Sequence, residues 1–137
     1  MNLIKRLLRR IFKHRGPFIA AEAVVLKSTL GRLCSIAHHA EVINTSVGTR
    51  TSIGRYTKTH DADIGGYCSI SYNVTIGAKF HPVDRISGHA FTSRKRFGIV
   101  GENVPDELFR TSVGNDVWIG CGAIILFGIV VGDGAVI

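Results

Sequence analysis

The chain has little of what would fix its shape by cross-links or sharp bends. Among 137 residues there are three prolines and three cysteines. The cysteines are odd in number and lack Cys-x-x-Cys spacing, which argues against a disulfide framework and against the common zinc patterns. We therefore predict that Cys34, Cys68 and Cys121 are small buried side chains in a reducing compartment, and we expect no metal site.

Long apolar runs are also missing. No stretch approaches the roughly 20 residues that a membrane-spanning helix needs. The N-terminus lacks the uninterrupted apolar segment of a signal peptide. We therefore expect a cytoplasmic protein.

Acidic residues are absent from the N-terminal segment, where six basic residues precede Glu22. The rest of the chain holds 11 basic and 10 acidic residues, so the net charge of +7 does not by itself indicate nucleic-acid binding. Apolar residues spaced along 1–16 predict a basic amphipathic helix that Gly16-Pro17 ends. Two interpretations stay open: a helix that packs on the body, or a peripheral contact with the inner membrane face, where each basic residue contributes about 1 kcal/mol.

Glycine, by contrast, is abundant at 16 residues, which suits short turns that need a positive φ. From residue 30 onward an apolar residue recurs at steps of six, with one-residue slips near 42–47 and 53–64. The recurring residues are Leu30, Ile36, Val42, Val47, Ile53, Ile64, Ile70, Ile76, Val113, Ile119, Ile125, Val131 and Ile137. A glycine often follows the apolar residue.

A step of six is not a helical period, and it predicts short strands separated by corners. Three such sides close a triangular coil, and stacked coils bury the repeated apolar residues. About four to five coils fit. A β-sandwich would need longer strands and hairpin turns. We therefore predict an all-β domain over 17–137, with a loop of about 78–112 extruded where the repeat stops.

The repeat resembles that of the hexapeptide-repeat acyltransferases, whose fold is a left-handed parallel β-helix. The stretches "FHPVDRISGHAF" and "VGNDVWIGCGA" resemble the branch of xenobiotic, galactoside and capsular-polysaccharide O-acetyltransferases. The resemblance implies acetyl-CoA as co-substrate, a saccharide or small-molecule acceptor, direct transfer without an acyl-enzyme, and a site between subunits of a homotrimer. Relatives continue with a further coil and often a C-terminal helix, so we expect the C-terminal part to be truncated.

His81 is the predicted catalytic residue. Acetyl transfer to a hydroxyl requires a base for its proton, and histidine changes protonation near neutral pH. His81 lies where the repeat breaks, beside a proline, at the root of the loop. Asp84, Asp106 and Glu107 are alternative partners to orient its ring. Histidines 38, 39 and 60 are expected to have surface or packing roles.

Other site residues follow from the resemblance. It implies that Cys121, with Gly120, contacts acetyl-CoA. Trp118 is expected to be a packing residue, and it is also a candidate to border the pantetheine arm. Asn73 is similar to a position near the acceptor sugar. Asp84 and His89, both within the loop, are also candidates to contact the acceptor. Arg94, Lys95 and Arg96 are candidates to meet phosphates or an anionic glycan.

The leading expectation is an O-acetyltransferase acting on a surface polysaccharide or its precursor. A xenobiotic acetyltransferase and a non-catalytic trimeric β-helix scaffold are the alternatives. A γ-class carbonic anhydrase also uses this fold, but the chain lacks its closely paired histidines.

Overall fold

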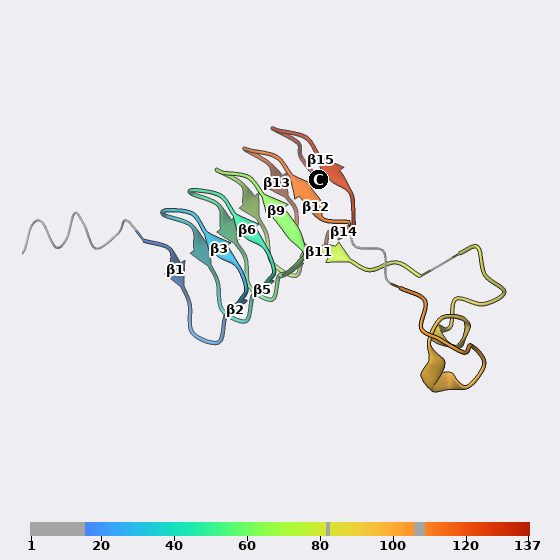
Figure 1. Cartoon of the computed structure of the whole chain (residues 1–137). Coiled ribbons are helices and arrows are strands. Elements are labelled where there is room, and N and C mark those ends of the chain that lie inside the picture. Colours follow the sequence, from blue (N-terminus) through green and yellow to red (C-terminus); the bar gives the residue numbers. More distant parts are fainter. Residues whose placement is uncertain (1–15, 82, 106–108) are drawn as a thin grey trace, which may run out of the picture.

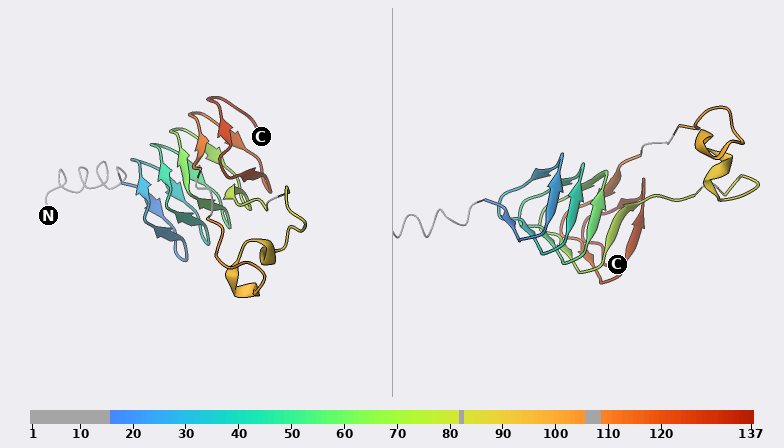
Figure 2. Two further views of the ribbon diagram at one scale, coloured as in Figure 1. Left: turned by 45° about the vertical axis from the view of Figure 1, so that its right-hand side comes forward. Right: turned by 90° about the horizontal axis from the view of Figure 1, so that it is seen from below.

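The protein is a parallel β-helix with one large loop. The computed structural model describes residues 16–81, 83–105 and 109–137. The amphipathic helix expected over 1–16 lies outside the described residues, apart from Gly16. Fifteen short strands wind into a triangular prism, and the loop projects from it as a separate lobe (Figures 1 and 2).

Each face of the prism is one parallel five-stranded sheet. Face 1 contains β1 (Phe18–Ile19), β4 (Ser35–Ile36), β7 (Ser52–Ile53), β10 (Ser69–Ile70) and β13 (Trp118–Ile119). Face 2 contains β2 (Val24–Leu26), β5 (Glu41–Ile43), β8 (Lys58–His60), β11 (Thr75–Ala78) and β14 (Ile124–Leu126). Face 3 contains β3 (Thr29–Leu30), β6 (Ser46–Val47), β9 (Ala62–Ile64), β12 (Thr111–Val113) and β15 (Val130–Val131).

The predicted all-β parallel β-helix is confirmed. Five coils are complete, and an isolated bridge between Trp118 and Val136 begins another, so the prism is longer than the four to five coils expected. The first strand, β1, precedes the residue at which the repeat becomes visible in the sequence.

The coil period is 17 residues, as shown by the pairing of Phe18 with Ser35 and of Ser35 with Ser52. In each early coil, the step from one inward residue to the next is six residues from face 1 to face 2 and from face 3 to the next face 1. The step from face 2 to face 3 is five residues. The missing apolar residue between Ile53 and Ile64 is Thr59, which is fully buried on face 2 beside Ile76. A polar but β-branched residue thus fills a core position, so the apolar pattern in the sequence lacks one member there.

The core consists of three ladders of inward side chains. Every member listed here is buried: Ile36, Ile53, Ile70 and Ile119 on face 1; Val42, Thr59, Ile76 and Ile125 on face 2; Val47, Ile64 and Val113 on face 3. Stacking identical or similar branched side chains at the sheet spacing excludes water from the whole length of the prism.

Buried threonines tie successive coils at the corners. The Thr51 hydroxyl donates to Gly65 O at 2.7 Å and accepts from Cys68 N at 3.1 Å. The Thr57 hydroxyl likewise donates to Ser71 O at 2.7 Å and accepts from Val74 N at 3.2 Å. Each threonine therefore satisfies one donor and one acceptor of the coil above it, which would otherwise be buried without a partner.

The glycines have the predicted role at only a few corners, where Gly122, Gly128 and Gly134 have a positive φ of 68–76°. Most positive-φ corner positions carry other residues, for example Glu22, His39 and Tyr56, each with φ of 58–59°. Gly48 and Gly54, which follow core residues, have no positive φ. A Cβ at Gly48 would collide with the backbone at Gly65 in the next coil. These glycines allow coils to approach closely, and they are not needed for the turns.

The cysteine prediction is correct for two positions and wrong for the third. Cys34 and Cys68 occupy buried corner positions, whereas Cys121 is exposed. Burial raises the pKa of the Cys34 thiol, which keeps it protonated and unreactive. Cys121 differs because its place in the coil is the outward side of a corner.

Candidate active site

The loop leaves and rejoins the prism at one corner, between faces 2 and 3, which we call the second corner. Ala78, the last residue of β11, accepts a hydrogen bond from Phe127 N at 2.9 Å. On the returning side, the rings of Phe109 and Phe127 lie 6.5 Å apart. Both roots of the loop are therefore held against the same turn of the last coil.

An ion pair fixes the returning root. Arg110 Nε lies 2.8 Å from Asp63 Oδ2 and Arg110 Nη2 lies 2.9 Å from Asp63 Oδ1, in a two-pronged contact. Arg110 Nη2 also donates to Ala62 O at 2.8 Å, and Ser46 donates to Asp63 at 2.7 Å. The hydrogen bonds from Arg110 and Ser46 lower the pKa of Asp63.

Beyond its roots the loop forms a small lobe with two 3₁₀ helices, η1 (Ala90–Thr92) and η2 (Lys95–Phe97). His89 precedes η1, and its Nδ1 accepts from Phe91 N at 3.2 Å. The His89 ring lies 5.6 Å from the ring of Phe91 and 5.1 Å, edge-on, from that of Phe97. His89 thus has a packing and capping role within the lobe, whatever it contacts outside.

His81 lies on the outgoing root, three residues beyond the end of β11. Its side chain is exposed, and among the described residues none forms a hydrogen bond or ion pair with its ring. Asp84 is exposed as well, and no hydrogen bond or ion pair joins it to His81. The other candidates to orient this ring, Asp106 and Glu107, lie outside the described residues.

The residues expected on the donor side lie elsewhere, on face 1 and on the corner between faces 1 and 2, which we call the first corner. Trp118 projects outward from β13 and is 56% exposed. Gly120 N donates to Ile137 O at 2.6 Å. Cys121 follows at the corner, beside Tyr72 of the preceding coil. A hydrogen bond with the Cys121 side chain raises the pKa of the Tyr72 hydroxyl.

Asn73 occupies the same first corner. It is exposed, has a positive φ of 56°, and donates from its backbone N to Arg55 O at 3.0 Å. Gly122 N donates to Tyr72 O at 3.2 Å, which places the turn of Asn73 directly next to that of Cys121. The structure therefore brings together Asn73, Gly120 and Cys121, and adds Tyr72, which the sequence analysis did not single out.

The two groups are separated within one chain. His81 and Asp84 belong to the loop at the second corner, whereas Asn73 and Cys121 lie at the first corner, and face 2 with β11 and β14 stands between them.

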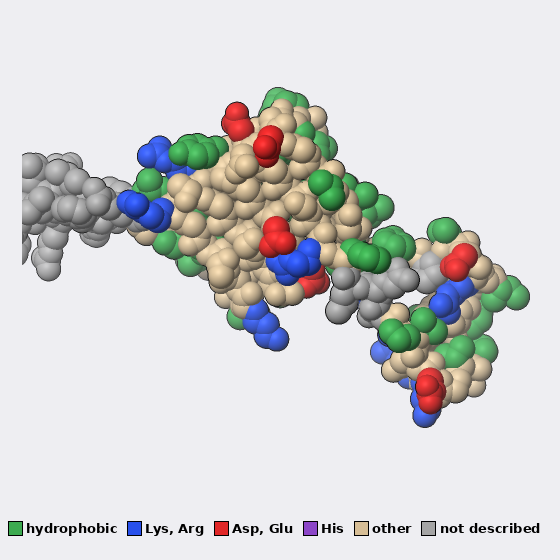
Figure 3. All heavy atoms as spheres, turned by 45° about the horizontal axis from the view of Figure 1, so that its top comes forward, with side chains coloured by type: hydrophobic (Ala, Val, Ile, Leu, Met, Phe, Trp, Pro, Cys, Tyr) green, Lys and Arg blue, Asp and Glu red, His purple; other side chains and the backbone are tan. Residues whose placement is uncertain are grey.

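Exposed apolar side chains occur at both ends of the prism, including the end from which the loop leaves (Figure 3). They include Ile124 at 67%, Ile129 at 46% and Val130 at 76% exposed, on and between β14 and β15. Clusters of exposed large apolar residues often mark protein–protein contact surfaces.

His38, His39 and His60 lie at the surface of the prism, as expected. His38 Nδ1 is 3.1 Å from Glu22 Oε2, and the His39 ring stacks on Tyr56 at 5.0 Å. His60 Nε2 is 3.9 Å from Glu41 Oε2. Within the described part of the chain, no group of three or more His, Cys, Asp or Glu side chains is placed to hold a metal ion.

The described helices are too short or too polar for any of them to cross a membrane. In comparisons with known proteins, no family model matches the chain and no curated protein matches it.

Proposed function

We propose that the protein is an acetyl-CoA-dependent O-acetyltransferase in which His81 is the general base. The observation that carries the proposal is the break in the β-helix. A rigid prism stops for 32 residues, 79–110, and an exposed imidazole stands at the exit, close to the hydrogen-bonded Ala78. A base held near a rigid element can be positioned for proton transfer without closure of a mobile tip.

The proposed reaction is direct transfer. The imidazole of His81 takes the proton of an acceptor hydroxyl while the oxygen attacks the carbonyl carbon of the thioester. The tetrahedral intermediate then collapses, its carbon–sulfur bond breaks, and the thiolate leaving group receives the proton from the imidazolium. Backbone N–H groups of a coil edge would stabilise the oxyanion.

The donor would lie along the first corner. Gly120 and Cys121 offer little side-chain bulk there, and Trp118 offers an exposed aromatic surface for the pantetheine arm. Because His81 and this corner are separated within one chain, we propose a homotrimer in which neighbouring copies complete each site. The exposed apolar residues of β14 and β15 support such an association.

The proposed acceptor is a saccharide hydroxyl of a surface polysaccharide or its precursor. The basic amphipathic sequence of residues 1–16, which lie outside the described residues, favours a substrate at the inner membrane face. A xenobiotic acceptor would give no reason for that segment. Binding of the full chain to anionic vesicles, compared with a variant carrying Arg9→Gln and Arg10→Gln, distinguishes the two.

The test of catalysis is release of free thiol from acetyl-CoA in the presence of a panel of glycans. We expect His81→Ala to reduce kcat about 10²- to 10⁴-fold, the usual contribution of a general base. His60→Ala is the matched control, since it removes a half-exposed histidine from the same part of the prism. No turnover by the full chain with any acceptor would favour a non-catalytic scaffold instead.

A further inference from the structure

The loop differs in charge from the prism that carries it. Residues 79–110 hold six basic and four acidic residues, whereas the coils, 16–78 and 111–137, hold five basic and six acidic ones. The excess positive charge of the folded part therefore belongs to the loop, and the β-helix is slightly acidic. One of the six basic residues, Arg110, is paired with Asp63 of the prism, so the rest of the loop carries a net charge of +1.

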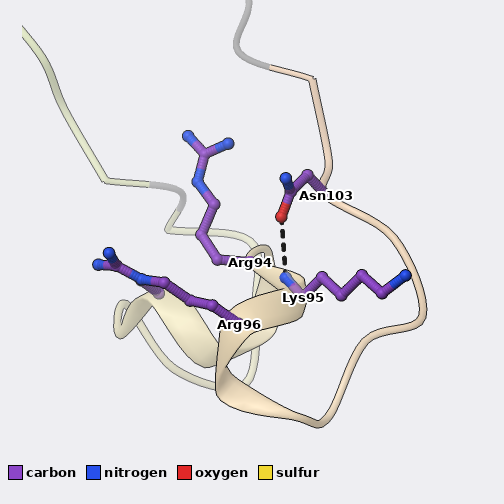
Figure 4. Close-up of a pocket in the computed structure, with 5 residues that line it drawn as sticks. Arg94, Lys95, Arg96 and Asn103 are labelled. Carbon is purple, nitrogen blue, oxygen red and sulfur yellow. Dashed lines mark hydrogen bonds between the residues drawn. The ribbon is translucent and has the colours of Figure 1, made fainter.

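The lobe encloses an open cavity of about 590 Å³. Its lining residues are Ala90, Arg94, Lys95, Arg96 and Asn103 (Figure 4). Three of these five residues are cations, and none is an acid. The volume lies within the range of sites that bind small molecules, roughly 300–1,000 Å³, and is far larger than a single inorganic anion requires.

Backbone contacts fix the cavity wall. Lys95 N donates to Asn103 Oδ1 at 2.9 Å, and Val104 N donates to Ser93 O at 2.9 Å. These bonds hold the returning segment against η2. Because Asn103 Oδ1 already accepts from Lys95, its amide N–H groups remain as donors toward a ligand.

The three cationic side chains that line the cavity point in different directions (Figure 4). Arg94 and Arg96 extend from one side of η2, and Lys95 extends from the other (Figure 4). Arg94 Nη1 donates to Val104 O at 3.3 Å, so this side chain is also part of the wall. An arrangement of separated cations matches a ligand with more than one anionic group, such as a diphosphate or a bisphosphate, better than a single carboxylate.

From this geometry we propose that the cavity lined by η2 and Asn103 binds a phosphate-bearing ligand of nucleotide size. The phosphates have two chemical sources: coenzyme A itself, or an acceptor sugar linked to a nucleoside diphosphate. Adenosine 3′,5′-bisphosphate represents the first and UDP the second. Binding requires no acyl transfer, so the proposal does not depend on the role of His81.

The experiment is calorimetric titration of the full chain with each probe at low ionic strength. We expect one of the two to bind, and Lys95→Gln and Arg96→Gln each to weaken its affinity about fivefold or more, since charge-assisted hydrogen bonds to phosphate are lost. The matched control is Arg32→Gln, which removes the same charge from an exposed position on the prism. Its affinity should equal that of the unmodified chain.

Lys95→Arg keeps the charge and should retain binding, which separates loss of an anion contact from loss of the lobe structure. Preference for the bisphosphate identifies the donor as the source, and preference for UDP identifies the acceptor. The proposal is overturned when neither probe binds, when adenosine or uridine binds as tightly as its phosphorylated form, or when Arg32→Gln weakens binding as much as the lobe variants do.

Discussion

Each 17-residue coil has buried positions both on its faces and at its corners. Two residues of the same type can therefore have very different surroundings. Two buried threonines illustrate this. Thr51 both donates and accepts a hydrogen bond, to Gly65 O and from Cys68 N. Thr59 stands in the core ladder, and its hydroxyl makes only one long contact, 3.4 Å, to Glu41 O.

We therefore expect opposite effects from one substitution. Thr51→Val leaves a buried N–H and a buried C=O without partners and should lower the free energy of unfolding by about 2–3 kcal/mol. Thr59→Val replaces a poorly bonded hydroxyl by a methyl group among Val42 and Ile76, and should be neutral or stabilising by about 0.5–1 kcal/mol. Urea unfolding of both variants measures the difference, and equal losses would contradict it.

The three cysteines also differ by position. Cys121 is exposed and should react with a thiol reagent in the folded protein, whereas Cys34 and Cys68 are buried and should not. The expected result is one fast equivalent of thiol in buffer and three after denaturation. Cys121→Ser should remove the fast equivalent. Two fast equivalents would show that a corner column opens readily.

Residue-level features explain which parts of the structure could be predicted from the sequence. Branched apolar residues at steps of six specify the coil directly, because each side places one large side chain in the core. The core position of Thr59 was not predicted because the residue is polar. The positive φ at corners such as Glu22, His39 and Tyr56 was not predicted because these residues are not glycine. The Asp63–Arg110 contact joins residues 47 apart. It becomes apparent only when the loop is known to start after β11 and end before β12.

At the scale of elements, the strands are too short to be stable singly. Each segment is therefore stabilised by its contacts with the neighbouring coil. The returning root of the loop depends on Arg110 and Asp63. The folded-state pKa of Asp63 lies below its unfolded value, which is near 3.9. The contact therefore stabilises the protein above about pH 4 and ceases to do so as the pH falls through the folded pKa.

Arg110→Gln should accordingly destabilise the protein by up to about 1 kcal/mol at pH 7, because the pair is half-exposed. The difference from the unmodified chain should shrink below about pH 4. Unfolding curves at pH 7 and pH 3 test this. Asp63→Asn combined with Arg110→Gln is the control, and the two losses should not add, since either change removes the same contact.

The position of His81 could be anticipated from the break in the repeat, but its separation from Cys121 could not. That separation follows from the order of the corners: the loop interrupts the second corner, and "WIGCG" occupies the end of face 1 and the first corner. Sequence spacing gives the number of residues between two positions. It does not say which side of a triangular coil each one faces until every step is assigned.

At the scale of the whole molecule, the loop is an insertion that leaves the coil register intact. Ser69 pairs with Trp118 across it, and Asp63 pairs with Ser112. Joining residue 78 directly to Thr111 would restore the 17-residue period. Residue 78 would then take the place occupied by Lys27, Asn44 and Asp61, whose φ values are 50°, 47° and 49°.

A chain that lacks 79–110 and carries Ala78→Asn should therefore fold, because asparagine tolerates a positive φ. Its far-ultraviolet circular dichroism should retain the β signal, and it should have no acetyltransferase activity. The same deletion with Ala78 unchanged is the control and should be less stable by about 1 kcal/mol. A disordered product in both cases would show that the lobe is required for folding.

Both ends of the insertion are bound to the same turn, around Ala78, Phe109 and Phe127. The lobe is therefore attached to the prism at one place. A loop of different length or sequence could therefore stand at this corner while the register of the neighbouring coils is kept.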